Sequence, residues 1–206
     1  RCFDKPDKSL EIKLSNAKTV NLLFKQGELL IRHSSKNPKK GFFTGYYKNI
    51  YETKKIWKNN WFHTGDIVKI DKFNNLYFVD RKKNIIRRSG ENISSAEIEA
   101  TLLGLSEIKN TAVCAYPHEI YDEEVLAFII LKNKKNETEK YAKKIIYKLS
   151  KNLTYFKLPA YIQFIDKLPI TSSQKIKKND LIKKFKEENK LKIYDLCEYK
   201  KLFKIN

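Results

Sequence analysis

Residues 61–99 read WFHTGDIVKIDKFNNLYFVDRKKNIIRRSGENISSAEIE and combine features of a strand, a hairpin, a charged connection and a helix start. Thr64-Gly65-Asp66 predicts a tight turn directly after Trp61 and Phe62, an aromatic pair that we expect to be buried. An ionised carboxylate at this point can accept two hydrogen bonds at once. Asp66 is therefore suited to bind a vicinal diol such as that of a ribose.

The remainder of this stretch predicts a hairpin, an exposed connection and a helix. Residues 67–79 alternate apolar and polar side chains around Asn74-Asn75, which predicts a β-hairpin. Residues 80–83, Asp-Arg-Lys-Lys, contain no apolar side chain, so we expect all four charges to face solvent. Residues 94–97, Ser-Ser-Ala-Glu, form a capping box. The helix that it opens has an apolar stripe of Ile98, Leu102 and Leu105.

These motifs resemble the adenylate-forming superfamily, which includes acyl-CoA synthetases, peptide-synthetase adenylation domains and beetle luciferases. The matching residues are the turn ending at Asp66, Asp80-Arg81 with Lys83, and the Gly-Glu-Asn-Ile-Ser sequence at 90–94. This last motif is most similar to acyl-CoA synthetases, including the carnitine/crotonobetaine-CoA ligase-like branch. Several motifs in one order are more specific than a single short pattern.

A second motif, LPITSSQKI, occupies residues 168–176 and resembles a closing motif of the same family. Pro169 and the Thr/Ser run predict an irregular loop that carries Lys175 outward. Composition alone favours an ordinary surface lysine, but the position within the motif favours a catalytic one. Gln174 stands where the family usually has glycine, so we expect the loop to lose a backbone conformation that glycine permits.

The resemblance implies a role for five residues. Asp66 would bind the ribose hydroxyls, Arg81 the nucleotide, and Lys83 would be the hinge. Lys175 would act in adenylation, and Gly90 would face the pantetheine thiol of coenzyme A. The implied ligands are ATP, coenzyme A and a small carboxylic acid, with a magnesium site expected in a missing upstream region.

The expected fold class is α+β, in two parts joined by the hinge. Residues 1–80 would be a β-rich distal subdomain of a large domain, residues 81–83 the hinge, and residues 84–206 a mobile α/β lid. The basic tail, residues 190–206, is expected to be a solvated surface segment. Strands are predicted at 10–14, 20–24, 28–32, 111–116, 125–131 and 161–165, and helices at 141–149 and 177–189.

Charge and cysteine content constrain the function less. Lys and Arg exceed Asp and Glu by 43 − 24 = 19, which suits polyanionic ligands, although the lysines are dispersed along the chain. Because ATP, coenzyme A and nucleic acid are all polyanions, the charge does not distinguish an enzyme from a nucleic-acid-binding protein. We expect no specific nucleic-acid binding.

Cys2, Cys114 and Cys197 lack metal-type spacing, and so do the histidines. We expect a reducing cytoplasmic compartment for these cysteines. No apolar run is long enough for a membrane span.

The chain begins at Arg1 and contains no methionine, so we expect it to be a piece of a longer protein. It has no Ser/Thr/Gly-rich phosphate loop and no Tyr-Gly-x-Thr-Glu segment, which carries the family's magnesium-associated glutamate. The resemblance reaches residue 184 but covers only the last part of a full enzyme. Two alternatives remain: an adenylation domain that loads a carrier protein, and a catalytically incomplete fragment that acts as a basic binding module.

Overall fold

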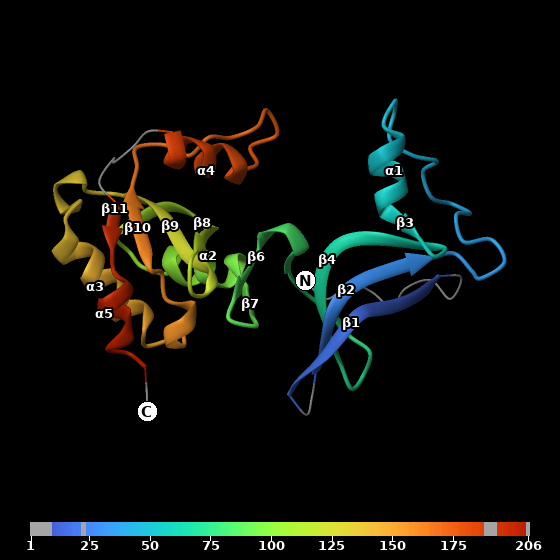
Figure 1. Ribbon diagram of the computed structural model, residues 1–206, viewed down its shortest axis with the longest axis horizontal. Helices are drawn as coiled ribbons and strands as arrows, with labels where there is room; N and C mark the ends of the chain where they lie inside the picture. The colour runs from blue at the N-terminus through green and yellow to red at the C-terminus, as the bar shows by residue number, and fades with distance from the viewer. Residues whose placement is uncertain (1–9, 22–23, 188–192, 205–206) are drawn as a thin grey trace. The chain divides into compact units, whose positions relative to one another are not determined.

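The computed structural model describes residues 10–21, 24–187 and 193–204 (Figure 1). The chain divides into two compact units, residues 1–83 and residues 84–206, which we call the N-terminal and the C-terminal unit. Both combine helices with largely antiparallel sheets, so the α+β prediction is confirmed.

The N-terminal unit is an antiparallel sheet built around one long strand, β4. The strands are β1 (Glu11–Asn21), β2 (Phe24–Arg32), β3 (Trp57–Lys58), β4 (Trp61–Asp71) and β5 (Leu76–Arg81), with one helix, α1 (Ile50–Ile56). One edge of β4 pairs with β2, and the other edge is shared by β3 and then β5. The predicted hairpin is β4–β5, and its turn is held by Asp71 Oδ1, which accepts hydrogen bonds from Phe73 N at 2.8 Å and Asn75 N at 2.9 Å.

The prediction of separate strands at 10–14 and 20–24 was wrong. The strand β1 runs without interruption through both segments as far as Asn21, and β2 starts at Phe24, while residues 22 and 23 lie outside the described part. The polar residues between the two runs look like a turn in the sequence. A register shift between Ser15 and Lys18 accommodates them inside the strand instead, as a β-bulge does.

The C-terminal unit is a six-stranded mixed sheet centred on β9. The strands are β6 (Ile85–Arg88), β7 (Glu91–Ser94), β8 (Ile108–His118), β9 (Asp122–Leu131), β10 (Tyr161–Phe164) and β11 (Ile193–Asp195). The order is β11-β10-β9-β6-β7, with β8 along the other edge of β9. Only the β9–β10 pair is parallel among the described strands.

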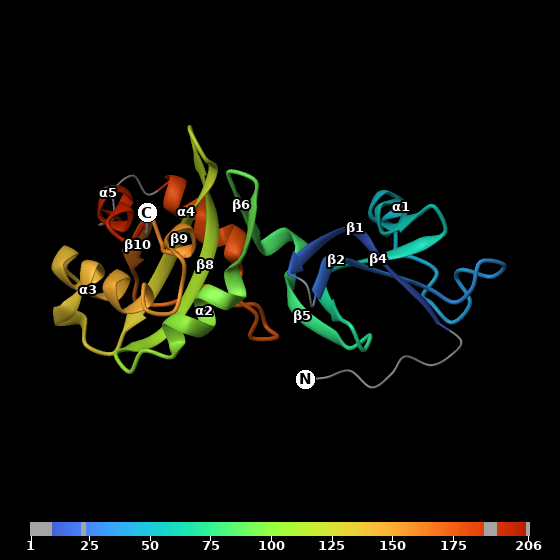
Figure 2. The ribbon, with the colours of Figure 1, turned by 90° about the horizontal axis from the view of Figure 1, so that it is seen from below.

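Helices cover both faces of this sheet (Figures 1 and 2). They are α2 (Ser95–Leu103), α3 (Glu139–Leu149), α4 (Lys178–Glu187) and α5 (Cys197–Lys201), with short 3-10 turns at Lys82–Asn84, Lys134–Asn136 and Tyr155–Lys157. Successive side chains of a strand point to opposite faces. Val125, Ala127 and Ile129 of β9 therefore pack with α2 and α3, whereas Leu126 and Phe128 pack on the α4 side. The apolar run at 125–131 is thus a strand buried on both faces.

The predicted helix signals are confirmed at α2 and α3. Ser94 caps α2 by accepting a hydrogen bond from Glu97 N at 3.2 Å, and Ile98 and Leu102 are fully buried. Leu105, the third residue of the predicted stripe, lies beyond the end of α2 at Leu103 and packs against the core from there. Thr138 caps α3 in the same way through Tyr141 N at 3.3 Å. The buried side chains of α3 are Ala142, Ile145, Ile146 and Leu149.

The described part of the basic tail, residues 193–204, packs into the C-terminal unit, so the prediction of a solvated segment was wrong there. The strand β11 pairs antiparallel with β10, and the backbone N–H of Leu196 donates to Ala160 O at 2.8 Å. Leu196 is 1% exposed, and Lys200 on α5 is 2% exposed. Apolar residues and lysines are mixed in this segment without a regular helical or strand period, so the sequence does not predict the packing.

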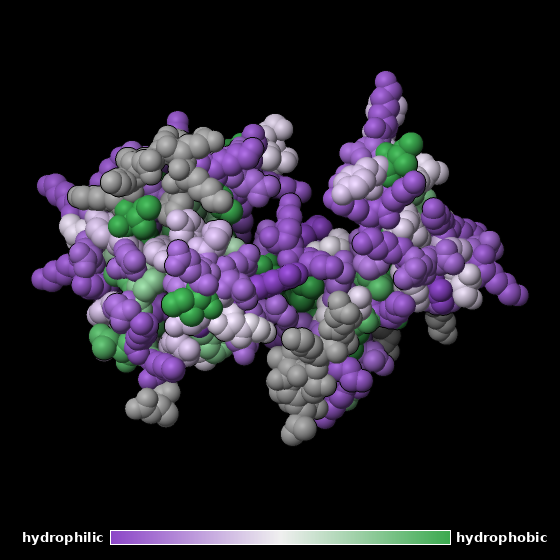
Figure 3. Space-filling view, viewed as in Figure 1, coloured by the Kyte–Doolittle hydropathy of each residue, from purple (hydrophilic) through white to green (hydrophobic). Residues whose placement is uncertain are grey.

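Other sequence expectations concern thiols, metals and membranes. Cys114 is buried and Cys197 half-buried, both are free thiols, and Cys2 lies outside the described residues. Within the described ranges, no group of three His, Cys, Asp or Glu side chains is placed to hold a metal ion. Nor does any helix described there have the length and apolarity to span a membrane. The face seen in Figure 3 is mostly hydrophilic, with hydrophobic residues scattered among the polar ones.

The packed tail makes a stability prediction. Leu196→Ala should lower the free energy of unfolding by about 2–5 kcal/mol, because it removes buried methyl groups and leaves a cavity. Leu202→Ala is the matched control, since Leu202 lies six residues on and is 75% exposed, and it should change stability by roughly 0.5 kcal/mol or less. Denaturant unfolding followed by circular dichroism measures both. Equal effects of the two substitutions would contradict the packing of the tail.

Candidate functional site

Thr64-Gly65-Asp66 forms a bulge inside β4, and the predicted tight turn was wrong. Between the pairs Glu28–Ile67 and Leu30–His63, one residue of β2 faces three residues of β4. Gly65 has φ +73°, a conformation that glycine adopts without strain. The Thr64 hydroxyl donates to Leu29 O at 2.8 Å and accepts from Asp66 N at 3.0 Å. The bulge fixes the direction of Asp66 because its backbone is tied to the neighbouring side chain.

Asp66 faces Arg81 across the β4–β5 pair. Arg81 Nε lies 2.9 Å from Asp66 Oδ1, which makes an ion pair. Oδ1 is enclosed but makes no hydrogen bond among the described residues, because the N–H of Arg81 is not directed at it. The Asp66 side chain is 26% exposed and that of Arg81 is 56% exposed. The carboxylate is thus held by one charge and keeps unused acceptor capacity.

The charged run at 80–83 is exposed only in part. Arg81, Lys82 and Lys83 are exposed, but Asp80 is 3% exposed, so the expectation was wrong for Asp80. The cause is the alternation of β5, which turns Asp80 inward and Arg81 outward. Asp80 Oδ1 accepts a hydrogen bond from Arg81 N at 2.7 Å, so the buried carboxylate helps to hold the backbone that carries Arg81.

Glu28 and its partners are a part of the site that the sequence did not reveal. Lys82 Nζ donates to Glu28 Oε2 at 2.8 Å, and His63 Nδ1 lies 3.3 Å from the same oxygen. Burial alone would raise the pKa of Glu28, but the hydrogen bonds from Lys82 and His63 outweigh it and lower the pKa. These contacts fix Lys82 to the sheet. The next residue, Lys83, is exposed and lies in a 3-10 turn, and the boundary between the two units follows it. A partner 54 residues away leaves no local pattern in the sequence.

Gly90 lies in the two-residue turn of the β6–β7 hairpin. Arg88 pairs with Glu91, and both turn residues are left-handed, Ser89 with φ +46° and Gly90 with φ +84°. This is the geometry that two-residue hairpins favour, and it accounts for the glycine. A Cβ on Gly90 would meet no atom within 4 Å, so a side chain there would project into open space.

The loop that carries Lys175 is ordered by its own backbone. Ile170 and Ile176 form a bridge, and Thr171 N donates to Lys175 O at 2.8 Å. Gln174 has φ +60°, so the loop keeps the left-handed conformation that we expected it to lose. The closed turn imposes this conformation on a residue other than glycine, at some cost in strain. Lys175 is exposed, and its ammonium group makes no ion pair with any residue that the structure describes.

The five predicted site residues fall into three places. Asp66 and Arg81 touch on the N-terminal unit, and Lys83 follows them along the chain. Gly90 and Lys175 both belong to the C-terminal unit but lie on separate segments. Figures 1 and 2 show that the β6–β7 hairpin and the loop before α4 extend from this unit in opposite directions.

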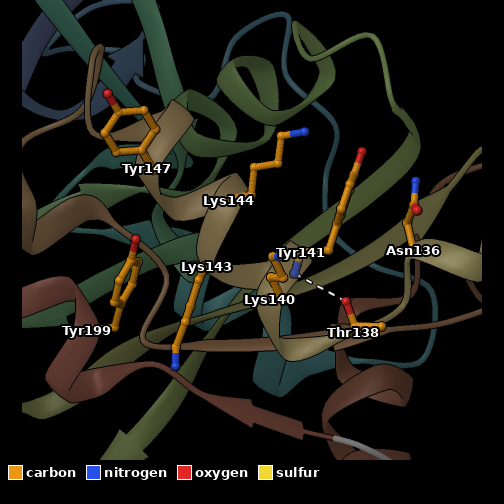
Figure 4. Close-up of a pocket in the computed structure, with 8 residues that line it drawn as sticks. All are labelled: Asn136, Thr138, Lys140, Tyr141, Lys143, Lys144, Tyr147 and Tyr199. Atoms are coloured by element: carbon orange, nitrogen blue, oxygen red, sulfur yellow. Dashed lines mark hydrogen bonds between the residues drawn. The ribbon is translucent and has the colours of Figure 1, made fainter.

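A cavity of about 600 Å³ lies elsewhere, beside α3 (Figure 4). Lys140, Lys143 and Lys144 line it together with tyrosines. In Figure 4 the side chains of Lys143 and Lys144 point away from each other, so these charges do not converge on a ligand. None of the five predicted residues lines this cavity. The predicted site residues thus lie outside this cavity.

Three comparisons with known proteins bear on this arrangement. The chain is 36% identical over 177 residues to a peroxisomal trans-cinnamate:CoA ligase of Petunia hybrida, covering 86% of this chain and 28% of the relative. It is 34% identical over 146 residues to a crotonobetaine/carnitine–CoA ligase of Salmonella arizonae, covering 70% and 28%. The structure superposes on o-succinylbenzoate CoA synthetase from Bacillus subtilis, in complex with its acyl-adenylate intermediate, with a TM-score of 0.70 and 26% identity, covering 86% and 34%.

The chain thus spans roughly a third or less of the length of the relatives it matches. Residues 97–175 match the sequence model of the AMP-binding enzyme C-terminal domain. This match includes Lys175 at its last position, and the superposition extends over both units. The chain belongs to the adenylate-forming, AMP-binding enzyme family and corresponds to the carboxy-terminal part of its members.

Proposed function

We propose that the complete enzyme containing this chain is an ATP-dependent acyl-CoA synthetase. It would convert a carboxylic acid, ATP and coenzyme A into acyl-CoA, AMP and pyrophosphate through an acyl-adenylate. The relatives at 34–36% identity are named CoA ligases, which supports this reaction class. The observation that carries the proposal is the Asp66–Arg81 pair, because it combines an under-used carboxylate with an exposed guanidinium.

In this proposal the pair binds the nucleotide. The Asp66 carboxylate would accept hydrogen bonds from the two ribose hydroxyls, which supply the donors that its oxygens lack in the described structure. Arg81 would hold the carboxylate through Nε. Its Nη1 also donates to Thr64 O at 3.4 Å, which would leave Nη2 for phosphate oxygens. The bulge at Gly65 and the buried Asp80 would keep both groups in place before the ligand arrives.

Lys175 would serve the first half-reaction. A carboxylate oxygen attacks the α-phosphorus of ATP, a P–O bond forms, and the bond to the departing pyrophosphate breaks. Negative charge on the phosphate and carboxylate oxygens must be brought together in this step. An ammonium group without a competing ion pair, presented on a closed turn, is suited to stabilise that charge.

Gly90 would serve the second half-reaction. The coenzyme A sulfur attacks the acyl carbon, a C–S bond forms, and the C–O bond to AMP breaks while the thiol proton passes to solvent. The open space over Gly90 would let the thiol arm approach along the hairpin. Because the hairpin and the Lys175 loop extend in opposite directions, we propose that the lid rotates about Lys83 to present each face in turn.

Magnesium and the compartment complete the proposal. Magnesium would supply charge neutralisation of the phosphates in ATP chemistry of this kind. We assign no described residue to the ion, since none of the described acids form a suitable group. We propose the cytoplasm as the compartment because Cys114 and Cys197 are free thiols.

The first prediction from this proposal concerns Lys175. In the complete enzyme, Lys175→Ala should slow acid-dependent adenylation on the order of a hundredfold or more, because it removes a charge needed in the transition state. Lys177→Ala is the matched control, an exposed lysine two residues away that should change the rate less than about threefold. Single-turnover adenylate formation measures both. Equal losses in the two variants would refute the catalytic assignment.

A second prediction concerns Gly90. Gly90→Leu should slow thioester formation from a supplied acyl-adenylate at least about tenfold while leaving adenylation nearly unchanged, because the new side chain would occupy the thiol's path. Gly41→Leu is the control for backbone strain, since Gly41 also has a positive φ, +78°, and open surroundings. Rapid-quench assays of each half-reaction give the result. Should Gly41→Leu slow the thioester step as much, strain and not position would be responsible.

A further inference from the structure

Glu124, in the centre of the C-terminal unit, is a fully buried carboxylate with two cations on it. Arg88 Nε donates to Glu124 Oε1 at 2.6 Å, and Lys200 Nζ donates to Oε2 at 2.8 Å. The side chains of Arg88 and Lys200 are 7% and 2% exposed. This group of three, which we call the Glu124 cluster, therefore carries one positive charge more than it can neutralise.

Burying an unbalanced charge is unfavourable, and the cluster shows the effect. Burial lowers the pKa of Lys200, although the attraction of Glu124 opposes this shift. At Arg88 burial also acts to lower the pKa, but the hydrogen bond and charge of Glu124 outweigh it, so the pKa of Arg88 is raised. The ring of Tyr121 lies 4.2 Å from the Arg88 guanidinium, and such a contact offsets only part of the excess charge. An anion from solvent would supply the rest.

A pocket of about 110 Å³ opens beside the cluster. Its charged lining consists of Arg88, Lys200, Lys201 and Lys204 against the single carboxylate of Glu124. Because a water molecule occupies about 30 Å³ in the liquid, the pocket has room for a few waters or one small oxyanion. The remaining polar side chains include Cys197, whose thiol stays neutral at pH 7 because burial raises its pKa.

Two neighbouring acids already have partners. Glu198 pairs with Lys201 at 2.6 Å and so neutralises this one of the lining cations, and Glu123 accepts a hydrogen bond from Arg87 N at 2.7 Å. Lys204 has no ion pair within the described part of the chain and lies 5.8 Å from the Tyr155 ring. Its ammonium group at the pocket is thus available to a ligand.

We propose that this pocket binds a phosphate group, and that the 3′-phosphate of coenzyme A supplies it. Arg88 lies two residues before Gly90 on the same hairpin, so a coenzyme whose thiol arm follows the hairpin carries its phosphates toward the Glu124 cluster. The proposal rests on the proposed function for its choice of coenzyme A. Free inorganic phosphate has the same chemistry, and the experiment separates the two sources.

The experiment is isothermal titration calorimetry of the chain with inorganic phosphate, coenzyme A and dephospho-coenzyme A at low salt. Coenzyme A should bind at least about fivefold more tightly than dephospho-coenzyme A, the loss expected for one charge-assisted contact. Lys204→Gln should weaken coenzyme A by a similar factor and leave dephospho-coenzyme A unchanged. Lys151→Gln is the matched control, because Lys151 also lies beside a tyrosine ring, Tyr147 at 5.3 Å, but does not line the pocket, and it should have no effect.

Each remaining outcome is decisive. Saturable binding of inorganic phosphate that Lys204→Gln abolishes, with equal binding of the two coenzymes, would support the phosphate site and overturn its assignment to coenzyme A. Absence of saturable binding, or equal effects of Lys204→Gln and Lys151→Gln, would overturn the site itself. Acyl-CoA formation by the complete enzyme is a separate measurement, so failure of this site and failure of the proposed function can be distinguished.

Discussion

The burial of Glu124 is the constraint on which the C-terminal unit depends. A carboxylate that is 1% exposed needs cations beside it, and they come from two distant segments, Arg88 on β6 and Lys200 on α5. Removing one partner of such a buried pair costs about 3–5 kcal/mol, because the other charge remains uncompensated. The central strand β9 therefore fixes the β6–β7 hairpin and the end of the chain to the same point.

This constraint links the core to the proposed chemistry. The hairpin turn at Gly90 lies two residues from Arg88, which forms a buried ion pair with Glu124. The Lys175 loop is closed by its own backbone hydrogen bonds. It is followed by α4, which packs on the face of the sheet opposite to α2 and α3. Both segments therefore belong to one compact unit. The proposed motion that presents each of them to a single site would then take place outside this unit, and Lys83 stands at the division between the units.

The sequence predicted the features that depend on local patterns. The strand at β9 follows from its continuous run of apolar and β-branched residues, and the stripes of α2 and α3 follow from side-chain period. The turn glycine at Gly90 and the Lys175 loop follow from short motifs. The bulge at Gly65 and the buried Asp80 depend on how β4 pairs with its neighbours, which residue types alone do not specify. The partner of Lys200 lies 76 residues earlier, so nothing in the sequence around Lys200 predicts its burial.

The central claim is that the C-terminal unit presents two different faces to one site. Its direct test is pulsed electron spin resonance on the complete enzyme, with labels introduced as unnatural amino acids at Lys72 and either Ser172 or Glu91, all exposed. Between the ATP-bound and the AMP-plus-coenzyme A states, the account predicts that the Lys72–Ser172 distance increases and the Lys72–Glu91 distance decreases. If both distances stay the same, or change in the same direction, the two-face lid is contradicted.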